Sequence, residues 1–595
     1  MMAAMRGFVA FLVGTLGLAA TAGAVEVTVP VRLDAAFIRQ AVLSQVFTGP
    51  DGTLAWDDGS GCAWIRLAQP TVGLAAGRLR VECAGEARLG KRLGGLCLAP
   101  WSWKGSVEVF EEPRLDGRTL RFAVVDSNLY DEGHHKGLTT GVLWDLVKGH
   151  VEPRLEAVRI DLEQPFAELR DWLPLVLPGS RERIERLLAS LAVRDPRVLP
   201  DAVEVTLAFT VEPRPVAATP EPALTPEELR RWQERWQRWD AFLTFVVKRF
   251  AGDASGELRQ AILAVLLDAR YELLEALAPS SPGAPDPVPA LFVRTWERLA
   301  PVLRHEAAGL PAATALRYTS FITAGDALAA LTALGPEVGL DLSADGLRRL
   351  ARMIDPAAPE DPVAFSEDVD PELRRLFGFG PPLPPPDVPP GVDAPDAPPS
   401  GGLGSWLVGT AWAAEGDGLA PWLPAGGDLD AYLARVRAVL ERAQADALGD
   451  GIAADLGAIH RRLVPATAWQ ESCWRQFVRA RGRIVPLKSA VGSVGIMQVN
   501  VHVWRGLYAP RGLHWDVAYN ARAGAEILLY YLRDAAHGGR DAPSLVRATY
   551  AMYNAGPQAR RTRSRGVERV VEALWRKYEA LAAEGTRGVA ACLGA

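Results

Sequence analysis

The spacing of apolar residues divides the chain into regions of different character. In residues 25–215, apolar and polar positions alternate over several stretches, which is the period of a half-buried strand; these are 25–31, 78–83, 106–110 and 203–211. Apolar residues at helical spacing lie between them and predict helices over 35–47, 140–151, 166–173 and 181–191. We therefore expect an α+β domain with an antiparallel sheet. A lipid-binding groove on that sheet is an alternative to an ordinary apolar core.

Residues 216–378 change to a helical period. Pro226 suits the first turn of a helix, and further helices are expected over 258–277, 288–303 and 343–354. The first helix carries an aromatic stripe at three- and four-residue spacing: Trp232, Trp236, Trp239, Phe242 and Phe245. Such a stripe can bind sugar rings, but packing against neighbouring helices is the favoured interpretation. The region is predicted to be an all-α scaffold.

A proline-rich stretch separates this scaffold from the rest of the chain. Ten of the nineteen residues over 381–399 are proline, which predicts an extended, semi-rigid segment. We expect a linker over 379–403 and an autonomous unit over 404–595. The alternative is that the apolar run over 406–408 docks on the helical scaffold and joins the two.

The C-terminal region is again mostly helical in its pattern. Helices are expected over 430–445 and 452–463, and Pro465 is expected to open another that reaches Phe477. Asn520 is expected to cap a helix over 521–535. Two more are expected over 543–553 and 566–582. With the two preceding regions, this predicts a multidomain protein whose last domain is mostly α.

Composition and the first residues narrow the class of protein. The chain has 595 residues, of which 49% are hydrophobic and 23% charged, and a net charge of −6, so nucleic acid is not an expected partner. Residues 1–24 combine Arg6, an apolar run over 8–18 and the small residues of 22–24, which predicts a secretory signal peptide. The run is too short to span a membrane, so we expect a soluble exported or periplasmic protein.

Export permits disulfide bonds, and the chain has five cysteines: Cys62, Cys83, Cys97, Cys473 and Cys592. Cys83 lies on the apolar face of an alternating segment and is interpreted as a core residue. Cys62 and Cys97 both follow glycine-rich turns and are the preferred disulfide pair, although sequence alone cannot fix connectivity. Cys473 is interpreted as a helix packing residue rather than a nucleophile.

Three motifs in the last third of the chain carry chemistry. Glu471 lies in Ala-Trp-Gln-Glu-Ser-Cys-Trp (468–474), beside the apolar face of an expected helix. A carboxyl held against apolar groups has a raised pKa, as a general acid requires. Gly-Ile-Met-Gln (495–498) and Tyr-Asn-Ala-Gly-Pro (553–557) follow. In this order the motifs resemble the lytic transglycosylase domain, whose fold is shared with goose-type lysozymes.

The resemblance implies a lysozyme-like fold and non-hydrolytic cleavage of peptidoglycan glycan strands, without a cofactor or metal. Glu471 would be the single catalytic acid and base. Substrate would be bound by Ser489, Gly495, Met497, Gln498, Tyr553 and Asn554. In that family the hydroxyl corresponding to Tyr553 approaches the acid, so Tyr550 is interpreted as core. For Ser489, an ordinary turn residue is an equally good interpretation.

The sequence departs from the family pattern in one segment. Glu471 and Gln498 are 27 positions apart, wider than is common in the family, and the insertion carries the basic residues Arg475, Arg479, Arg481, Arg483 and Lys488. These could contact an anionic substrate, but a solvated loop or hairpin is the preferred interpretation. The insertion changes the shape that we expect for the cleft, but it does not change the assignment of Glu471.

Other functions remain open from the sequence. Hydrolysis would need a second group to position water, for which Asp516, Glu526 and Asp541 are candidates. A non-catalytic peptidoglycan-binding scaffold is a second alternative. Residues 25–215 are a candidate module for binding a lipid or a cell-envelope protein.

Overall fold

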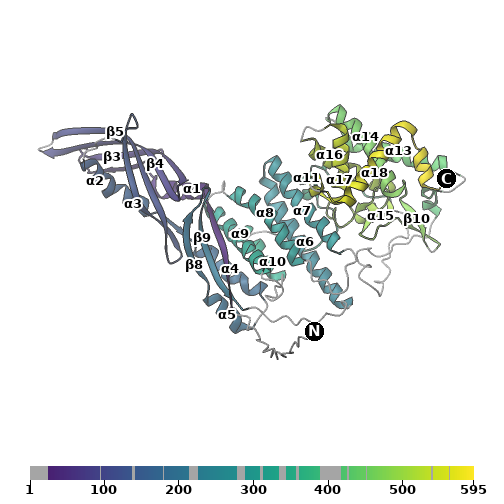
Figure 1. Ribbon diagram of the computed structural model, residues 1–595, viewed down its shortest axis with the longest axis horizontal. Helices are drawn as coiled ribbons and strands as arrows, with labels where there is room; N and C mark the ends of the chain where they lie inside the picture. Colours follow the sequence, from purple (N-terminus) through teal and green to yellow (C-terminus); the bar gives the residue numbers. More distant parts are fainter. Residues whose placement is uncertain are drawn as a thin grey trace, which may run out of the picture.

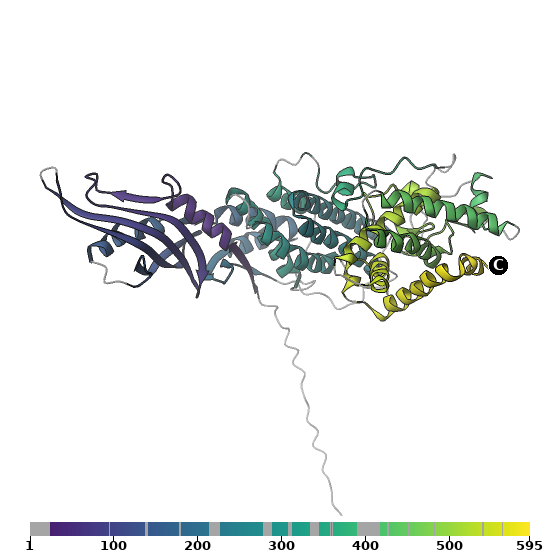
Figure 2. The same cartoon turned by 90° about the horizontal axis from the view of Figure 1, so that it is seen from above.

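The computed structural model shows an elongated molecule with sheets at one end, helices in the middle and a mostly helical body at the other end (Figures 1 and 2). It describes residues 24–93, 96–136, 141–177, 180–212, 226–277, 288–307, 312–333, 344–356, 359, 361–388, 417–424, 428–449, 452–480, 482–537, 541–561 and 563–594. The expected signal peptide, apart from Ala24, and residues 389–408 lie outside these ranges.

Two antiparallel sheets build the N-terminal end. The first has the strand order β1–β9–β8, and the second runs β2–β3–β4–β5–β6–β7. The strands are β1 (Val25–Asp34), β2 (Leu54–Asp57), β3 (Trp64–Ala75), β4 (Arg78–Leu93), β5 (Leu96–Asp116), β6 (Thr119–Asp131), β7 (Arg159–Asp161), β8 (Ala192–Val198) and β9 (Ala202–Val211). The predicted antiparallel α+β region is confirmed. Strands β4 and β5 are much longer than their alternating segments predicted.

Short helices cover these sheets, and the apolar sides of both form one core. The helices are α1 (Ala35–Val46), α2 (Gly141–His150), α3 (Glu152–Glu156), α4 (Glu163–Val176) and α5 (Arg181–Ala189). Cys83 is buried in that core with a free thiol. Cys62 and Cys97, the pair preferred from the sequence, are joined in a disulfide with their Cα atoms 5.6 Å apart.

A set of packed helices forms the middle of the molecule. They are α6 (Pro226–Asp253), α7 (Gly256–Leu277), α8 (Val288–Ala307), α9 (Ala312–Ala333) and α10 (Ala344–Ile354). From the aromatic stripe, Trp236, Trp239 and Phe242 are buried, so these three pack in the core rather than offering a sugar-binding surface. Helix α9 also packs against β1 and α4, which connects this part to the sheets.

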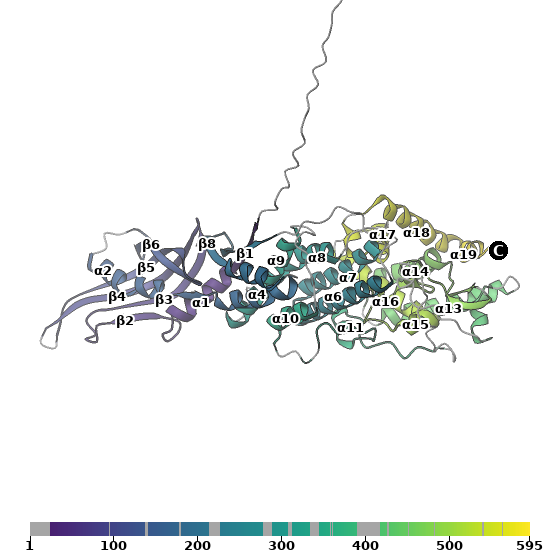
Figure 3. The same ribbon diagram turned by 90° about the horizontal axis from the view of Figure 1, so that it is seen from below.

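The C-terminal body is mostly helical, as the sequence predicts (Figure 3). Its helices are η2 (Asp417–Trp422), α13 (Leu429–Leu448), α14 (Ala454–Ser472), α15 (Pro510–Trp515), α16 (Val517–Ala536), α17 (Ala542–Ala555), η3 (Pro557–Arg560), α18 (Arg565–Glu584) and α19 (Arg587–Cys592). Its strands are the antiparallel pairs β10 (Phe477–Ala480) with β11 (Arg483–Pro486) and β12 (Ser493–Val494) with β13 (Val499–Asn500).

The segment before the proline-rich stretch docks on this C-terminal body. It carries α11 (Pro371–Phe377), whose Arg374 is fully buried and pairs with Glu526 at 3.0 Å. Arg374 also donates to the Leu507 carbonyl at 2.8 Å. Further along, the Asp387 amide donates to Asp516 at 2.9 Å. The described part of the expected linker, 379–388, is therefore packed rather than free, and a unit beginning at 404 would lose these partners.

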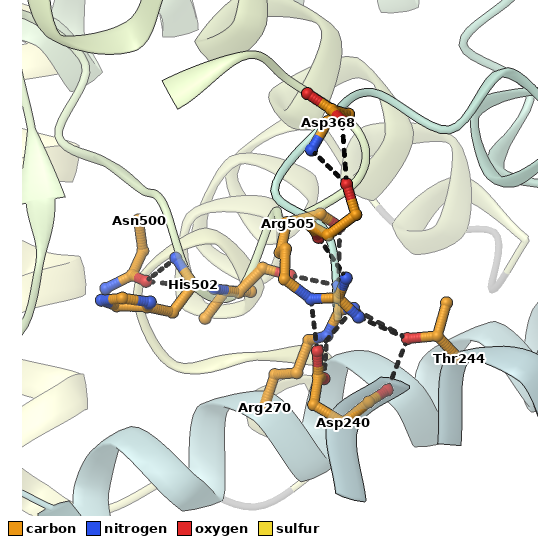
Figure 4. Close-up of polar contacts among 9 residues, drawn as sticks. Asp240, Thr244, Arg270, Asp368, Asn500, His502 and Arg505 are labelled. Atoms are coloured by element: carbon orange, nitrogen blue, oxygen red, sulfur yellow. Dashed lines mark hydrogen bonds and ion pairs between the residues drawn. The ribbon is translucent and has the colours of Figure 1, made fainter. Parts of the chain in front are cut away.

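A buried ion-pair network also joins the middle helices to the C-terminal body (Figure 4). Asp240 of α6 accepts from Arg270 of α7 at 2.7 Å and from Arg505, on the turn after β13, at 2.5 Å. Thr244 bonds to both guanidinium groups. Burial alone would raise the pKa of Asp240, but the two arginine charges outweigh it and hold that pKa below its ordinary value. The two regions therefore share a buried contact, and the autonomy of 404–595 expected from the sequence stays a prediction.

Among the helices of the described residues, none has the length and apolar character needed to cross a membrane.

Candidate active site

Glu471 lies in the last turn of α14, a helix that the sequence analysis divided in two. Pro465 was expected to open a new helix but lies inside α14. An interior proline removes one backbone hydrogen bond and costs about 3 kcal/mol. Here Leu463, Val464 and Ala466 on either side are fully buried, so packing holds the helix together despite the lost bond.

The helix ends at Ser472 rather than at the expected Phe477. Cys473 and Trp474 have φ angles of 52° and 62°, in the left-handed region that stops a helix. Their amides donate to Trp469 and Ala468 at 3.1 and 3.2 Å, which satisfies carbonyls of the last turn. Glu471 is thereby held at a fixed helix terminus instead of mid-helix.

Cys473 fixes this terminus covalently. It was interpreted as a packing residue but forms a disulfide with Cys592, with the Cα atoms 5.8 Å apart. The bond attaches α19, near the end of the chain, to the residue two positions after Glu471. The neighbouring Gly588 packs so closely that a Cβ there would come within 2.3 Å of the Trp469 ring. Helix α19 therefore packs against the end of α14, which carries Glu471.

The carboxyl of Glu471 is half-buried and receives one short hydrogen bond. The Tyr550 hydroxyl of α17 donates to its Oε1 at 2.6 Å. Burial raises the pKa of Glu471 to about 7, while the bond from Tyr550 and the charge of Lys577 on α18 act in the opposite direction. Near neutral pH the group is therefore able to give up a proton and to take one back.

The identity of this tyrosine corrects the sequence analysis. Tyr550 is fully buried, as expected of a core residue, but its hydroxyl is the one that bonds to the acid; the Tyr553 hydroxyl, expected in that place, donates to the Met497 carbonyl at 2.7 Å. The two rings are one helical turn apart and stack with centroids 6.4 Å apart, so they face the same side of α17. Tyr271 of α7 donates to the Tyr553 carbonyl at 2.9 Å, so a middle helix supports the site.

The turn at Gly495 is built around the glycine. Its φ is 75°, and a Cβ would come within 2.4 Å of both the Asn520 and the Gln476 side chains. Gln476 accepts from the Ile496 amide at 2.8 Å. Because a larger residue fits neither the backbone angle nor the space, glycine at position 495 is what allows this turn to form. Gln476 belongs to none of the three motifs, yet its side-chain amide packs against Gly495 and holds the turn through Ile496.

Met497 does not line an open surface as expected. Its side chain is fully buried, and a Cβ at Gly524 would come within 2.5 Å of it. Its amide donates to Asn520 at 2.9 Å, and its carbonyl accepts from Tyr553. Met497 therefore acts as a core residue whose backbone ties the turn to α16 and α17.

Asn520 was expected to cap a helix, but Asp516 does so. Asp516 accepts from the Ala518 and Tyr519 amides at 2.9 and 3.0 Å, and α16 begins at Val517. Asn520 is fully buried one turn later, where it also donates to the Val494 carbonyl at 2.9 Å. A cap was expected at position 520 because asparagine is common at helix N-caps, whereas the burial of Asn520 inside the helix depends on tertiary contacts.

The remaining predicted site residues divide between turn and surface. Gln498 is half-buried with a φ of 49° and donates to the Gly495 carbonyl at 2.9 Å. Ser489 accepts from the Ser493 amide at 3.0 Å, the interaction of a turn serine. Asn554 is exposed at the end of α17. Glu471, Gly495, Met497 and Tyr553 thus lie in one packed assembly, in which Glu471 is the group suited to chemistry.

The three other acids considered for catalysis are each engaged in a helix cap or a buried ion pair. Asp516 caps α16 and accepts from Asp387. Glu526 is buried and pairs with Arg374 and Arg522. Asp541 caps α17 by accepting from the Ser544 amide at 2.9 Å. None of them contributes to the pKa shift of Glu471, whose causes are burial, Tyr550 and Lys577.

The basic insertion forms the β10–β11 hairpin, in agreement with the preferred interpretation. Arg479 and Arg483 on it are exposed. Arg475 donates to the Ser472 carbonyl at 3.0 Å. Burial lowers the pKa of Lys488 to about 8. Arg481 lies outside the described residues.

Within the described ranges, no group of three or more His, Cys, Asp and Glu side chains is arranged to hold a metal ion. Comparisons of the chain with protein-family models, with curated proteins and with solved structures found no match.

Proposed function

We propose that the protein is a lytic transglycosylase, which cleaves the β-1,4 bond between N-acetylmuramic acid and N-acetylglucosamine in peptidoglycan. The observation that carries the proposal is a single half-buried glutamate with a pKa of about 7, hydrogen-bonded by Tyr550. The order of the three motifs and their assembly around α14, α16 and α17 add support. On this proposal the C-terminal body has a lysozyme-like fold.

Glu471 performs both proton transfers. Its carboxyl protonates the glycosidic oxygen, and the bond from that oxygen to the muramyl anomeric carbon breaks, which releases the N-acetylglucosamine 4-hydroxyl. The substrate's own acetamido oxygen stabilises the cationic centre. The Glu471 carboxylate then takes the proton of the muramyl 6-hydroxyl as its oxygen bonds to the anomeric carbon. One C–O bond replaces another, Glu471 ends protonated, and no water is consumed.

Tyr550 is a positioning residue in this scheme. Its hydroxyl donates to Oε1, so it orients the carboxyl and stabilises the carboxylate formed after the first proton transfer. Without that bond, burial alone would hold the proton more tightly. Burial and Tyr550 together place the pKa where one group can alternate between acid and base.

Hydrolysis is the competing chemistry. Most glycosidases use two carboxylates, the second to activate water or attack the sugar. Asp516, Glu526 and Asp541 are each held in a cap or a buried ion pair, which favours the single-acid route. We also propose that the protein is exported to the periplasm or beyond, on the basis of residues 1–24 and the two disulfides.

The test is digestion of purified peptidoglycan by the full-length mature protein, followed by mass spectrometry of the released fragments. The proposal expects muropeptides with 1,6-anhydromuramyl ends, which are lighter by one water than hydrolytic products. Reducing ends would instead assign a lysozyme-type hydrolase. Absence of any release, from a protein shown to be folded, would favour a non-catalytic scaffold.

A further inference from the structure

The β4–β5 hairpin lies at the opposite end of the molecule from α14, the helix that carries Glu471, and it has three exposed apolar side chains (Figure 1). These are Leu96, Leu98 and Trp101, which are 71%, 48% and 37% exposed. Isolated exposed apolar residues are ordinary, but three within six positions of one narrow hairpin form a contiguous surface. We call Leu96, Leu98 and Trp101 the hairpin patch.

Strand pairing explains why the patch faces one way. Leu98 pairs with Lys91 and Trp101 pairs with Leu89, with an irregularity in register between these pairs. Because Leu89 and Lys91 are two positions apart on β4, Leu98 and Trp101 lie on the same face of the hairpin. The intervening Cys97 is held on the other side by its bond to Cys62.

That face is the apolar face of the domain, continued past its core. Val81, Cys83 and Ala87, at odd positions of β4, are buried on it, as is Trp103 of β5. Beyond them the strands project past the end of the sheet's core, and the apolar pattern continues without helices to cover it (Figure 2).

Basic residues flank the patch. Between positions 88 and 103 the chain has three basic residues and no acidic one, in a protein with a net charge of −6; the next basic residue, Lys104, pairs with Glu86 and Glu132. Lys91, which pairs with Leu98, is exposed on the face of the patch, and Arg92, which pairs with Cys97, is exposed on the opposite face of the same narrow hairpin. A local excess of positive charge next to exposed leucine and tryptophan suits a surface that is anionic at its boundary and apolar beneath.

We propose that the hairpin patch docks on the surface of an anionic phospholipid bilayer, with Lys91 and Arg92 at the headgroups and the three apolar side chains below them. A two-stranded tip is far smaller than the roughly 800 Å² per partner of a stable protein interface. Shallow insertion of a few side chains combined with basic residues is instead a mode of reversible membrane binding.

The arrangement has a consequence for the whole molecule. The β4–β5 hairpin and the body that contains α14 lie at opposite ends of the long axis, so docking would hold the candidate active site away from the bilayer (Figure 3). The Cys62–Cys97 disulfide braces the hairpin against its neighbouring loop, so the patch is presented on a stiff arm. The proposal does not depend on the chemistry at Glu471.

The experiment is co-sedimentation of residues 25–595 with vesicles, so that the apolar run over 8–18 cannot contribute. One set of vesicles contains phosphatidylcholine alone, and the other adds phosphatidylglycerol. We expect binding to the anionic vesicles that weakens with added salt. Leu96→Ser/Leu98→Ser/Trp101→Ser should reduce binding at least 10-fold, and Lys91→Gln/Arg92→Gln should reduce it several-fold and remove the salt dependence.

The matched control is Val125→Ser/Leu175→Ser, which removes apolar side chains that are also 37% exposed but lie outside the hairpin patch. It should bind like the unmodified protein. Circular dichroism and thermal melting show whether each variant is folded. If the folded triple variant binds the anionic vesicles as well as the unmodified protein does, the proposal is wrong. It is also wrong if the unmodified protein does not bind anionic vesicles. If the unmodified protein self-associates without vesicles and the triple variant does not, the patch binds a second copy of the chain, and the membrane proposal is wrong.

Discussion

The two ends of the molecule each bury a glutamate with a raised pKa, and the surroundings of the two carboxyls differ. Glu471 in the C-terminal body is half-buried, accepts from Tyr550 and has a pKa of about 7. Glu111 on β5 of the N-terminal sheet is fully buried, and its pKa is raised to about 8 by burial and by the charge of Glu156. Neither Glu111 oxygen has a hydrogen-bond partner in the described parts of the chain.

The comparison shows that a raised pKa alone does not identify a catalytic acid. Glu111 has no access to solvent, and no donor among the described residues stabilises its charged form, so it stays protonated below about pH 8. Glu471 has both, and can therefore alternate between two protonation states. Asp240 is a third case: it is as deeply buried, but two arginines lower its pKa and keep it charged. Partners and access, rather than burial, separate the three roles.

The largest expected effect is on catalysis. Glu471→Gln keeps the shape and the acceptor for Tyr550 but removes the proton, so peptidoglycan-cleaving activity should fall by about 10²–10⁴-fold. Glu111→Gln is the same change at the buried glutamate of the N-terminal sheet and should leave the rate unaltered. Rates of fragment release from purified peptidoglycan measure both. Similar losses in the two variants would remove the distinction between them.

A large effect on stability is expected at Asp240. Asp240→Asn leaves Arg270 and Arg505 buried without their counter-charge, and loss of one partner in such a network costs about 3–5 kcal/mol. Glu163→Gln, at an exposed pair with Arg118, should cost less than about 1 kcal/mol. Urea unfolding measures both free energies. If the parent unfolds in a single transition and Asp240→Asn unfolds in two, the middle helices and the C-terminal body are coupled through this network. Equal free energies for Asp240→Asn and the parent would show that the network does not stabilise the fold.

A smaller effect is expected at the two stacked tyrosines. Tyr550→Phe removes a hydrogen bond to a charged group, so the maximal rate should fall about 10-fold. That bond lowers the pKa of Glu471, so its loss should also move the alkaline limb of kcat/KM, which begins near pH 7, to higher pH. Tyr553→Phe removes a bond to the Met497 carbonyl and should leave the limb in place. A shift in the limb with Tyr553→Phe alone would restore the assignment made from the motif.

The smallest effect is the pH dependence of stability at Glu111. Its pKa lies above the ordinary value of 4.5, so between about pH 4.5 and pH 8 the folded protein holds a proton that the unfolded chain releases. Stability conferred by this group therefore falls as pH rises through that window. Glu111→Gln lacks the proton, so from pH 5 to pH 6 it should gain up to about 1.4 kcal/mol relative to the parent. Parallel urea titrations at the two pH values test this.

Local patterns predicted the elements of the fold better than their extents and contacts. Alternation identified segments of β4 and β5, but not that the strands extend past the core, since the register irregularity between Leu89 and Lys91 interrupts the strict alternation. Pro465 predicted a helix start because sequence rules weigh its missing amide and not the burial around it. The packing of 379–388 was missed because proline-rich composition indicates backbone stiffness, not what Arg374 and Asp387 bind.

The candidate site was predicted in part for a similar reason. Glu471 followed from a local motif, and its raised pKa agrees with the expected apolar setting. Tyr550 was missed because the choice between two tyrosines one turn apart on the same side of α17 depends on the position of α17 along its axis relative to α14, which neither motif contains. Cys473 and Cys592 are 119 positions apart, and pairing over such a distance is set by tertiary structure.

The most direct test of the central claim compares the products of three proteins on the same purified peptidoglycan. Mass spectrometry of the soluble fragments should show 1,6-anhydromuramyl ends for the unmodified protein and for Glu111→Gln, and almost none for folded Glu471→Gln. Reducing ends from the unmodified protein, or anhydromuramyl ends at undiminished yield from Glu471→Gln, would contradict the account.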